Sequence, residues 1–240
     1  MSNNQIPLTT PAPIHPTETP DPSVSQVDGM KMVFVPAGKF KMGSEFGLSD
    51  EQPLHTVYLD SFWIDKTEVT NAMVQQCVQS GKCDQPSSTV YYDDPQYADH
   101  PVVFVSWNSA NDYCSWADRR LPTEAEWEKA ATWDPQKNEQ RIYPWGNKFD
   151  CRLGNFDDET ELDASLMPDT TPGCDGFVRS APVGSFPAGS SPYGALDMGG
   201  NGWEWVNEWY DVYPGGDVNA SSDFGQKYRV LRGGSWGSVN

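Results

Sequence analysis

The segment Gly199–Trp209 concentrates residue types that are suited to binding. It holds three tryptophans, three glycines and two glutamates within eleven residues, a mixture too specific for an ordinary core strand. Its glycines do not form a dinucleotide-binding loop, because no strand and helix flank them in the required order. Its tryptophans are typical of a core, although aromatic side chains beside glycine-rich loops also bind peptides and sugars. The segment is therefore the first candidate for a functional site.

The five cysteines are spaced as disulfide partners rather than as zinc ligands. Cys77 and Cys83 bracket a short glycine-containing loop, and Cys151 and Cys174 bracket a loop rich in proline, glycine and aspartate. No Cys-x-x-Cys pair occurs and no cysteine has a histidine nearby, which argues against a zinc site. Two disulfides in an oxidising compartment are predicted, with Cys114 left over. Five reduced cysteines in a cytosolic protein remain the alternative.

The three histidines and the serines offer little catalytic chemistry. His15 lies in a proline-rich segment, and His55 and His100 stand alone in the sequence. No serine has the Gly-x-Ser-x-Gly setting of a hydrolase nucleophile. A histidine-rich metal site and a hydrolase triad are therefore both disfavoured.

The charge of the chain excludes whole classes of partner. Its 240 residues carry 34 acidic and 16 basic side chains, a net charge of −18, so nucleic acid and anionic membrane surfaces would repel it. Such acidity is compatible with cation binding or simply with solubility. No apolar run reaches membrane-spanning length, and the N-terminus shows no signal peptide. An extracytoplasmic location would therefore make the chain part of a longer protein.

The N-terminal region is predicted to be a linker followed by strands. Residues 1–28 are rich in proline, threonine and serine and read as a disordered linker. The folded domain is expected at residues 29–240. Within it, 31–36 and 39–43 flank Ala37-Gly38 and predict a hairpin, and 55–65 alternates as a half-buried strand does.

Helices are predicted where caps and apolar periodicity coincide. The first begins after Thr70 as N-cap and stops at Gly81; the second runs from about residue 108 to 118. Thr123 and Glu126 form a capping box for a third. Beyond residue 146 turns predominate, with short strands near 181–186 and 228–233. With 21 glycines and 20 prolines, the chain is expected to form one α+β domain with low regular secondary structure.

The ordered set of motifs resembles the formylglycine-generating enzyme family, also called sulfatase-modifying factors. Any one motif is weak, but together they cover residues 29 to 240 in family order. The matching segments are Met32–Gly38 with Met42-Gly43, Asp65–Asn71, Pro101–Trp107, Arg120–Glu128, Tyr143–Asn147, Pro182–Pro187, Tyr193–Met198, Gly200–Trp205 and Arg232–Trp236. The resemblance implies a variant of the C-type-lectin-like fold, with calcium as an internal stabiliser.

The resemblance also implies two calcium sites built from side-chain oxygens and backbone carbonyls. They map onto Asn155, Phe156, Asp175 and Phe177, and onto Asp197, Gly200, Gly202 and Glu204. Calcium prefers six to eight oxygen ligands, and glycine lets irregular backbone turn its carbonyls inward. The alternative is that Asp197 and Glu204 cap turns and that Asn155 tolerates a left-handed backbone.

Active members of this family oxidise a sulfatase cysteine to formylglycine with oxygen and a copper(I) ion held by two thiolates. The first of these cysteines lies three residues after the serine of the Arg-Gly-Gly-Ser motif, where this chain has Ser238. The second position lies beyond Asn240, so the domain is expected to be truncated at its C-terminus. In relatives, the cysteine equivalent to Cys114 pairs with one downstream of this motif.

We therefore expect no catalytic residues in this chain, and a domain that acts as an extracytoplasmic binding or sensory module. Many bacterial relatives share the scaffold without the cysteine pair. The expected partner is an unknown protein, peptide or glycan. The alternative is a copper-dependent oxidase whose catalytic cysteines are lost by truncation.

Overall fold

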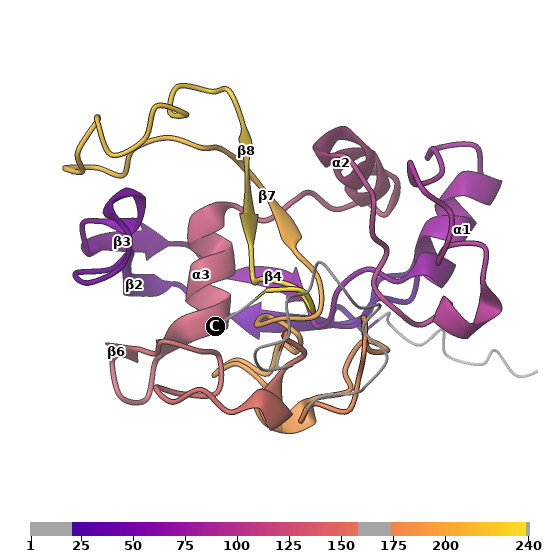
Figure 1. Cartoon of the computed structure of the whole chain (residues 1–240), viewed down its shortest axis with the longest axis horizontal. Coiled ribbons are helices and arrows are strands. Elements are labelled where there is room, and N and C mark those ends of the chain that lie inside the picture. The colour runs from indigo at the N-terminus through magenta and orange to yellow at the C-terminus, as the bar shows by residue number, and fades with distance from the viewer. Residues whose placement is uncertain (1–20, 158–173, 239–240) are drawn as a thin grey trace, which may run out of the picture.

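The structure, a computed structural model, describes residues 21–157 and 174–238. Helix α3 lies at the centre of this part of the chain, with α1 and α2 on one side and β2 and β3 on the other (Figure 1). The helices are α1 Asn71–Gln79, α2 Trp107–Trp116 and α3 Glu124–Thr132, with short 3₁₀ turns η1 Ser49–Glu51, η2 Pro95–Tyr97, η3 Cys151–Leu153 and η4 Pro187–Gly189. The strands are β1 Met32–Val35, β2 Gly38–Met42, β3 His55–Leu59, β4 Phe62–Asp65, β5 Trp133–Asp134, β6 Glu139–Gln140, β7 Glu204–Trp209 and β8 Arg229–Arg232.

The first four strands form one antiparallel ribbon. Strand β1 pairs with β4 and β2 with β3, and the register continues from Met32 opposite Asp65 to Met42 opposite His55. The predicted hairpin around Ala37-Gly38 is therefore wrong, because the chain only bends at Ala37 and reverses direction between β2 and β3. Pro36 has no amide hydrogen to donate and lies at the break in the ladder.

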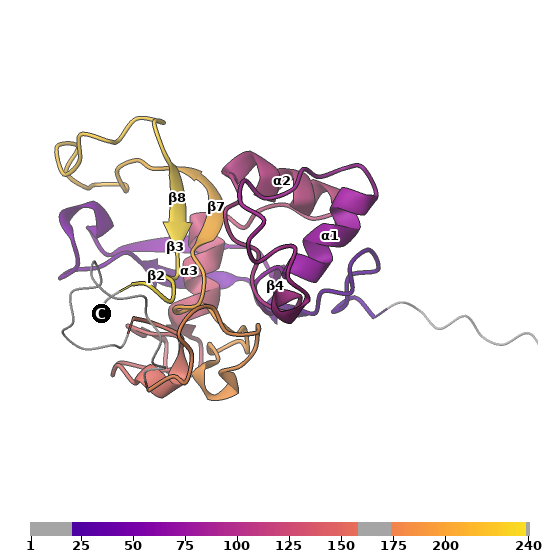
Figure 2. The same ribbon diagram turned by 45° about the vertical axis from the view of Figure 1, so that its right-hand side comes forward.

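The three predicted helices are confirmed, because their caps are local features of the sequence. The Thr70 hydroxyl accepts a hydrogen bond from the Met73 amide at 3.3 Å. Thr123 and Glu126 form the reciprocal capping box, at 3.1 and 2.8 Å. Helix α2 starts one residue earlier than predicted, with Ser106 as its N-cap. Helices α1 and α2 lie side by side, away from α3 (Figure 2).

Replacing Thr123 by alanine is expected to lower the free energy of unfolding by about 1 kcal/mol. The change removes the hydroxyl that satisfies the Glu126 amide in the first turn of α3. Urea unfolding of the variant measures the loss. Ser222, an exposed loop serine, provides the control: if Ser222→Ala is as costly as Thr123→Ala, the cap does not contribute.

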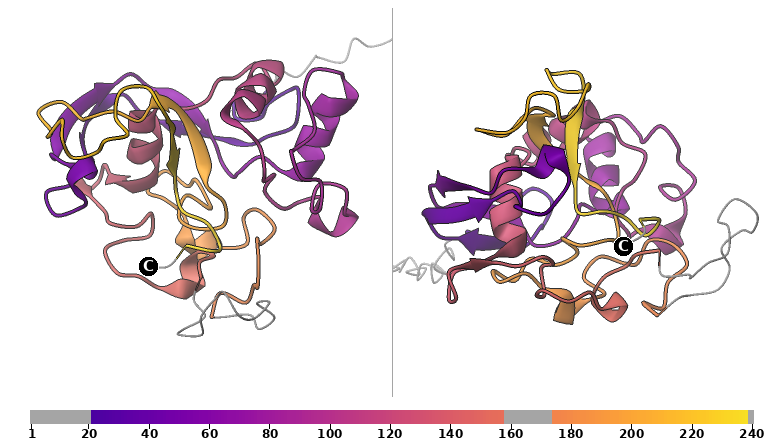
Figure 3. Two further views of the ribbon diagram at one scale, coloured as in Figure 1. Left: turned by 45° about the horizontal axis from the view of Figure 1, so that its top comes forward. Right: turned by 60° about the vertical axis from the view of Figure 1, so that its left-hand side comes forward.

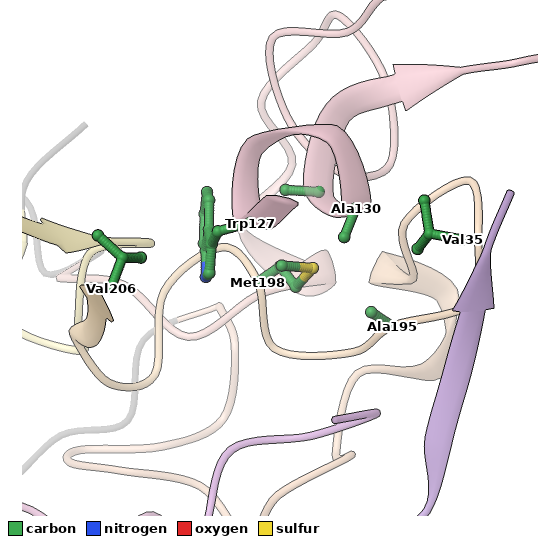
Figure 4. Packing of buried hydrophobic residues seen from close by; sticks show 7 residues of the cluster. Val35, Trp127, Ala130, Ala195, Met198 and Val206 are labelled. Carbon is green, nitrogen blue, oxygen red and sulfur yellow. The ribbon is translucent and has the colours of Figure 1, made fainter. Parts of the chain in front are cut away.

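The central core is built on one face of α3. Trp127, Ala130 and Ala131 of this helix pack with Val35, Ala195, Met198 and Val206 (Figure 4). Lys129 is buried too, and its ammonium group donates to the carbonyls of Pro36 at 2.7 Å and Gly38 at 3.2 Å. These two bonds tie α3 to the ribbon at the break in its ladder.

The C-terminal half has little regular structure, as the sequence predicts. Strands β7 and β8 pair antiparallel with a register shift between Trp205 and Trp209, which confirms the strand expected near 228–233. The strand expected near 181–186 is wrong, because these residues form turns. The segment Gly199–Trp209 does contain a strand, β7, over its second half. The described loops between α3 and β7 lie at the opposite side of the molecule from the loop that connects β7 to β8 (Figure 3).

A buried ion-pair network joins the N-terminal segment to α2. The Asp28 carboxylate accepts hydrogen bonds from the Arg119 guanidinium at 2.6 and 3.1 Å and from the Tyr113 hydroxyl at 2.5 Å. The Arg119 Nε atom lies 3.4 Å from Asp65. Val24 forms a β-bridge with Lys31. Residues 21–28, which the sequence places in the linker, thus contact the domain, while residues 1–20 lie outside the described part.

Both predicted disulfides are present. They join Cys77 to Cys83 and Cys151 to Cys174, and Cys114 is free and buried in α2. Burial raises the pKa of the Cys114 thiol to about 12, so that it stays protonated at neutral pH. In the part of the chain that is described, no helix has the length and apolar character needed to cross a bilayer.

Candidate functional site

The first predicted group of oxygen donors is brought together by two segments that the Cys151–Cys174 disulfide joins. The Asp175 carboxylate accepts hydrogen bonds from the amides of Phe156 at 3.2 Å and Phe177 at 2.8 Å. Asn155 is buried, and its amide nitrogen donates to the Arg179 carbonyl at 2.8 Å. Its side-chain oxygen is also buried and has no hydrogen-bond partner among the described residues. The first group therefore contains one buried oxygen, that of the Asn155 side chain, which accepts no hydrogen bond from the described residues.

The second predicted group lies in the turn that leads into β7. Asp197 has a left-handed backbone with φ of 60°, and its carboxylate accepts from the Gly184 amide at 2.6 Å. The other oxygen of Asp197 is buried and has no partner in the described structure. Glu204, the first residue of β7, accepts from the Trp127 indole at 3.0 Å. Both carboxyl groups point into the protein interior rather than into solvent.

Close packing explains the glycines of this turn. A Cβ atom on Gly200 would lie 2.2 Å from the carbonyl oxygen of Asn155, and one on Gly202 would lie 2.7 Å from Glu68 Oε1. Gly200 also has φ of 84°, a region that side chains rarely adopt. The two groups of donors are thus in direct contact through Asn155 and Gly200.

Two residues of the site were missed by sequence reasoning. Glu68 is buried beside Gly202, and one of its oxygens accepts from the Asn201 amide nitrogen at 2.6 Å. Its other oxygen has no partner among the described residues. Asn201, between Gly200 and Gly202, is almost completely buried with φ of 62°. An asparagine between two glycines signals a left-handed turn, but nothing in the sequence links it to Glu68.

Burial dominates the electrostatics of this region. It raises the pKa of Glu204 to about 8 and that of Asp197 to about 6. Burial also raises the pKa of Glu68 well above its usual value, and the negative charges of Asp197 and Glu204 add to the effect. None of the three forms an ion pair with lysine or arginine among the described residues. An ionised carboxylate in such a place needs a compensating cation.

The carboxylates of this region do not by themselves complete a metal site. Within residues 21–157 and 174–238, no three side chains of the histidine, cysteine, aspartate and glutamate types converge as a metal site. A cation here must therefore draw on carbonyl and amide oxygens as well as carboxylates. Ca²⁺ accepts such mixed oxygen shells in irregular geometry, whereas Zn²⁺ prefers nitrogen and sulfur.

The position expected for a copper ligand is occupied by a serine in a turn. The Ser238 hydroxyl accepts from the Ser235 amide at 3.0 Å, and the Ser238 carbonyl accepts from the Asp157 amide at 3.1 Å. All five cysteines lie in the described part of the chain, and two disulfides engage four of them. The fifth, Cys114, is buried among the side chains of α1 and α2.

Aromatic side chains are exposed at both ends of β7. Trp203 is 53% and Trp209 40% exposed, although tryptophans of this segment are more typical of a core. Trp205, between them, donates its indole hydrogen to the Val105 carbonyl at 3.1 Å. The Arg229 guanidinium lies 3.7 Å from the ring centre of Trp209 and 3.8 Å from that of Trp107. We call Trp209 and Arg229 the tryptophan surface.

A cavity of about 390 Å³ lies between the helix pair and the ribbon. Apolar side chains such as Val74, Tyr113 and Phe62 line most of it. Glu68 and Glu204 also lie on its wall. The second group of donors therefore borders a space large enough for a small ligand.

Comparison with known proteins identifies relatives over most of the chain. The family model described as Sulfatase-modifying factor enzyme 1-like domain matches residues 17–240. The chain is 36% identical to the serine/threonine-protein kinase pkn1 of Chlamydia caviae, over 87% of this chain and 33% of that protein. It is 32% identical to the formylglycine-generating enzyme of Bos taurus, over 86% of this chain and 66% of the enzyme.

A third relative is the hercynine oxygenase of Mycolicibacterium smegmatis, 33% identical over 85% of this chain and 54% of that protein. The chain thus spans between one third and two thirds of the length of these relatives.

Solved structures agree with the sequence relatives. PvdO from Pseudomonas aeruginosa superposes with a TM-score of 0.64 and 28% identity, covering 92% of this chain and 89% of PvdO. Treponema denticola variable protein 1 has a TM-score of 0.58 and 23% identity, covering 88% of this chain and 85% of that protein. At that identity the second likeness shows the fold alone.

Proposed function

Because the chain belongs to the sulfatase-modifying factor enzyme 1-like domain family, we propose that it is an extracytoplasmic binding or sensory module built on the family scaffold. Two disulfides support an oxidising location. The mixed fold with short strands and many turns is compatible with the C-type-lectin-like variant that the resemblance implies. The activity of any longer protein that contains this domain is a separate question.

One observation carries the proposal: the cysteines of this chain do not provide a pair of thiolates that could bind copper. Copper(I) prefers soft sulfur ligands, and a serine hydroxyl is a hard, neutral oxygen. Ser238 stands at the first ligand position, and its hydroxyl is engaged in the turn with Ser235. Cys114 is the one cysteine outside the disulfides, and a single buried thiol cannot form the pair.

We further propose that calcium occupies both groups of oxygen donors. The buried oxygens of Asn155 and Asp197 without partners support this, because each would otherwise be desolvated without compensation. In the first group Asn155, Phe156, Asp175 and Phe177 would hold the ion, and in the second Asp197, Gly200, Gly202 and Glu204. When bound, calcium would supply positive charge and a fixed arrangement of the surrounding loops.

The tryptophan surface is the proposed contact with a ligand. Exposed tryptophan and arginine side chains are enriched at recognition surfaces because they combine a large apolar area with hydrogen-bond donors. A protein, a peptide or a glycan all fit this chemistry. The cavity beside Glu68 and Glu204 supports a binding role as well.

The second candidate function is a copper-dependent oxidase that converts a sulfatase cysteine to formylglycine. Its support is the similarity to the bovine formylglycine-generating enzyme and to hercynine oxygenase. This function requires two thiolates that residues 21–238 do not supply.

Incubation of the chain with copper(I), oxygen and a Cys-x-Pro-x-Arg peptide is expected to give no aldehyde. Oxidation of the peptide thiol needs the metal held by two thiolates, and Ser238 cannot replace one of them. Mass spectrometry of the peptide after hydrazide trapping measures the aldehyde. The bovine formylglycine-generating enzyme serves as the positive control under identical conditions. Aldehyde formed by this chain above the level of free copper would establish the oxidase and reject the binding-module proposal.

A further inference from the structure

We infer that Asn201 joins the two groups of oxygen donors into one cooperative cation-binding unit. This inference rests on the calcium sites proposed above. The Asn201 side chain is almost completely buried between the groups. It contacts one residue of the first group and one carboxylate that adjoins the second.

Asn201 is bonded to the first group through both its backbone and its side chain. Its amide hydrogen donates to the Asn155 carbonyl at 2.7 Å. Its side-chain oxygen accepts from the Asn155 amide nitrogen at 3.0 Å. Because the nitrogen of Asn155 is engaged in this way, the oxygen at the other end of that amide is the atom left without a partner. Asn201 thereby fixes which way the oxygen of Asn155 points.

Asn201 orients the Glu68 carboxylate, which lies beside the second group, in the same way. The Asn201 amide nitrogen donates to one oxygen of Glu68 at 2.6 Å, and the other oxygen of Glu68 is left without a partner. That free oxygen adjoins Gly202, a proposed carbonyl donor. Gly200 and Gly202, two of the proposed carbonyl donors, flank Asn201 in the chain, and the Gly202 amide donates to the Gly200 carbonyl at 2.9 Å. A cation held in the second group would therefore fix the turn that directs the Asn201 side chain toward Glu68.

The side-chain amide of Asn201 is held in one orientation, in which it bonds Asn155 and Glu68 at the same time. Its oxygen accepts a second bond from the Ala181 amide at 2.8 Å, and its nitrogen donates a second bond to the Ala181 carbonyl at 3.3 Å. Rotation of the amide would break all four side-chain bonds at once. Only an amide offers two donors and a doubly accepting oxygen in this size. Asn201 consequently fixes the positions of the Asn155 and Glu68 side chains together. A cation that binds at one group stabilises both positions and thereby raises the affinity of the other group.

Calorimetric titration of chelator-stripped protein with CaCl₂ tests this coupling. We expect two ions to bind with a Hill coefficient above 1. Replacing Asp197 by alanine removes the side-chain oxygen of the second site, and the affinity of the first site should then fall about tenfold, within the range typical of coupled sites. Asn201 itself is unchanged in this variant, so the measurement does not depend on the folding of an Asn201 variant.

Asn201→Ala and Asn207→Ala form a matched pair. The backbones of the two residues lie in one segment, but Asn207 is exposed. Asn201→Ala should bring the Hill coefficient to 1, whereas Asn207→Ala should bind calcium like the unmodified chain. Two ions that bind independently, with the first-site affinity unchanged by Asp197→Ala, would overturn the coupling and leave the calcium sites standing. No calcium binding at all would reject both.

Discussion

Removal of calcium is expected to lower the thermal unfolding midpoint of the domain by roughly 10 °C or more. An ion that binds only the folded state at a thousand times its dissociation constant stabilises it by about 4 kcal/mol. For a domain of this size, each kcal/mol corresponds to about 2–4 °C. The effect is large because the buried carboxyl groups of Asp197, Glu204 and Glu68 have no cationic side chain beside them among the described residues. Without the ion they must take up protons or remain uncompensated.

Differential scanning calorimetry with excess CaCl₂ or excess EDTA measures this shift. The Glu204→Gln variant provides the matched control, because it keeps the size of the side chain and its bond to Trp127 but removes the charge. The chelator should shift its midpoint by a smaller amount than it shifts that of the unmodified chain. Magnesium should not replace calcium, since it demands a compact octahedral shell. Equal midpoints in CaCl₂ and EDTA, with elemental analysis showing no calcium in the purified protein, would count against both sites.

Replacing Asp28 by alanine is expected to lower the free energy of unfolding by about 3 kcal/mol or more. The change leaves the Arg119 guanidinium buried without its main partner, and breaking a buried ion pair costs about 3–5 kcal/mol. It also removes the acceptor of the Tyr113 hydroxyl. Asp65, 3.4 Å from Arg119, still offers a negative charge, which places the expected loss near the lower end of this range.

The ion pair of Asp28 with Arg119 also predicts that the stability of the domain depends on pH. Burial alone would raise the pKa of Asp28, but hydrogen bonds from Arg119, Ser25 and Tyr113 hold it well below its usual range. Its stabilising effect is therefore fully present above the unfolded pKa of about 4 and is lost as the pH falls below that value. The difference in stability between the unmodified chain and Asp28→Ala should accordingly be constant near neutral pH and narrow below about pH 4.

Urea unfolding between pH 7 and pH 2 checks both parts of this prediction. Asp21, exposed in the same segment, is the control, and its replacement by alanine should change the stability by less than about 0.5 kcal/mol. An Asp28→Ala variant as stable as Asp21→Ala would mean that the N-terminal segment does not hold Arg119 in solution.

The elements that sequence reasoning predicted correctly are those whose signals are local. The caps of α1 and α3 involve residues three apart, so that Thr70 and Thr123 announce their helices in the sequence. The ribbon was misread because its pairing joins strands that are distant in sequence. Ala37-Gly38 has the composition of a turn, yet the partner of β1 is β4 rather than β2. The sequence shows turn-forming residues at this position, but it does not show the long-range strand pairing that decides the fold there.

The candidate site shows the same difference between local signals, which the sequence carries, and long-range contacts, which it does not. The structure places Phe156 and Phe177 in hydrogen-bond contact with Asp175 and the carboxyl groups of Asp197 and Glu204 within electrostatic reach of each other. The assignment of both groups as calcium sites, which the family resemblance implies, stays a prediction. Glu68 and Asn201 were missed because they lie 133 residues apart, and their pairing depends on the packing of two irregular turns. Neither periodicity nor spacing carries that information. Burial, which decides the charge of Glu68, likewise exists only once the chain is folded.

The Cys151–Cys174 disulfide has a consequence for how this scaffold can be varied. The Cα atoms of Cys151 and Cys174 lie 5.9 Å apart, so the disulfide holds together the two segments that carry Asn155 and Asp175. The entropic cost of lengthening a loop grows only logarithmically, by about 0.6 kcal/mol for each doubling. Peptide sequence inserted between residues 158 and 173 would therefore cost little loop entropy, and the disulfide would still hold the segments of Asn155 and Asp175 together, as the display of an epitope or a grafted recognition loop requires.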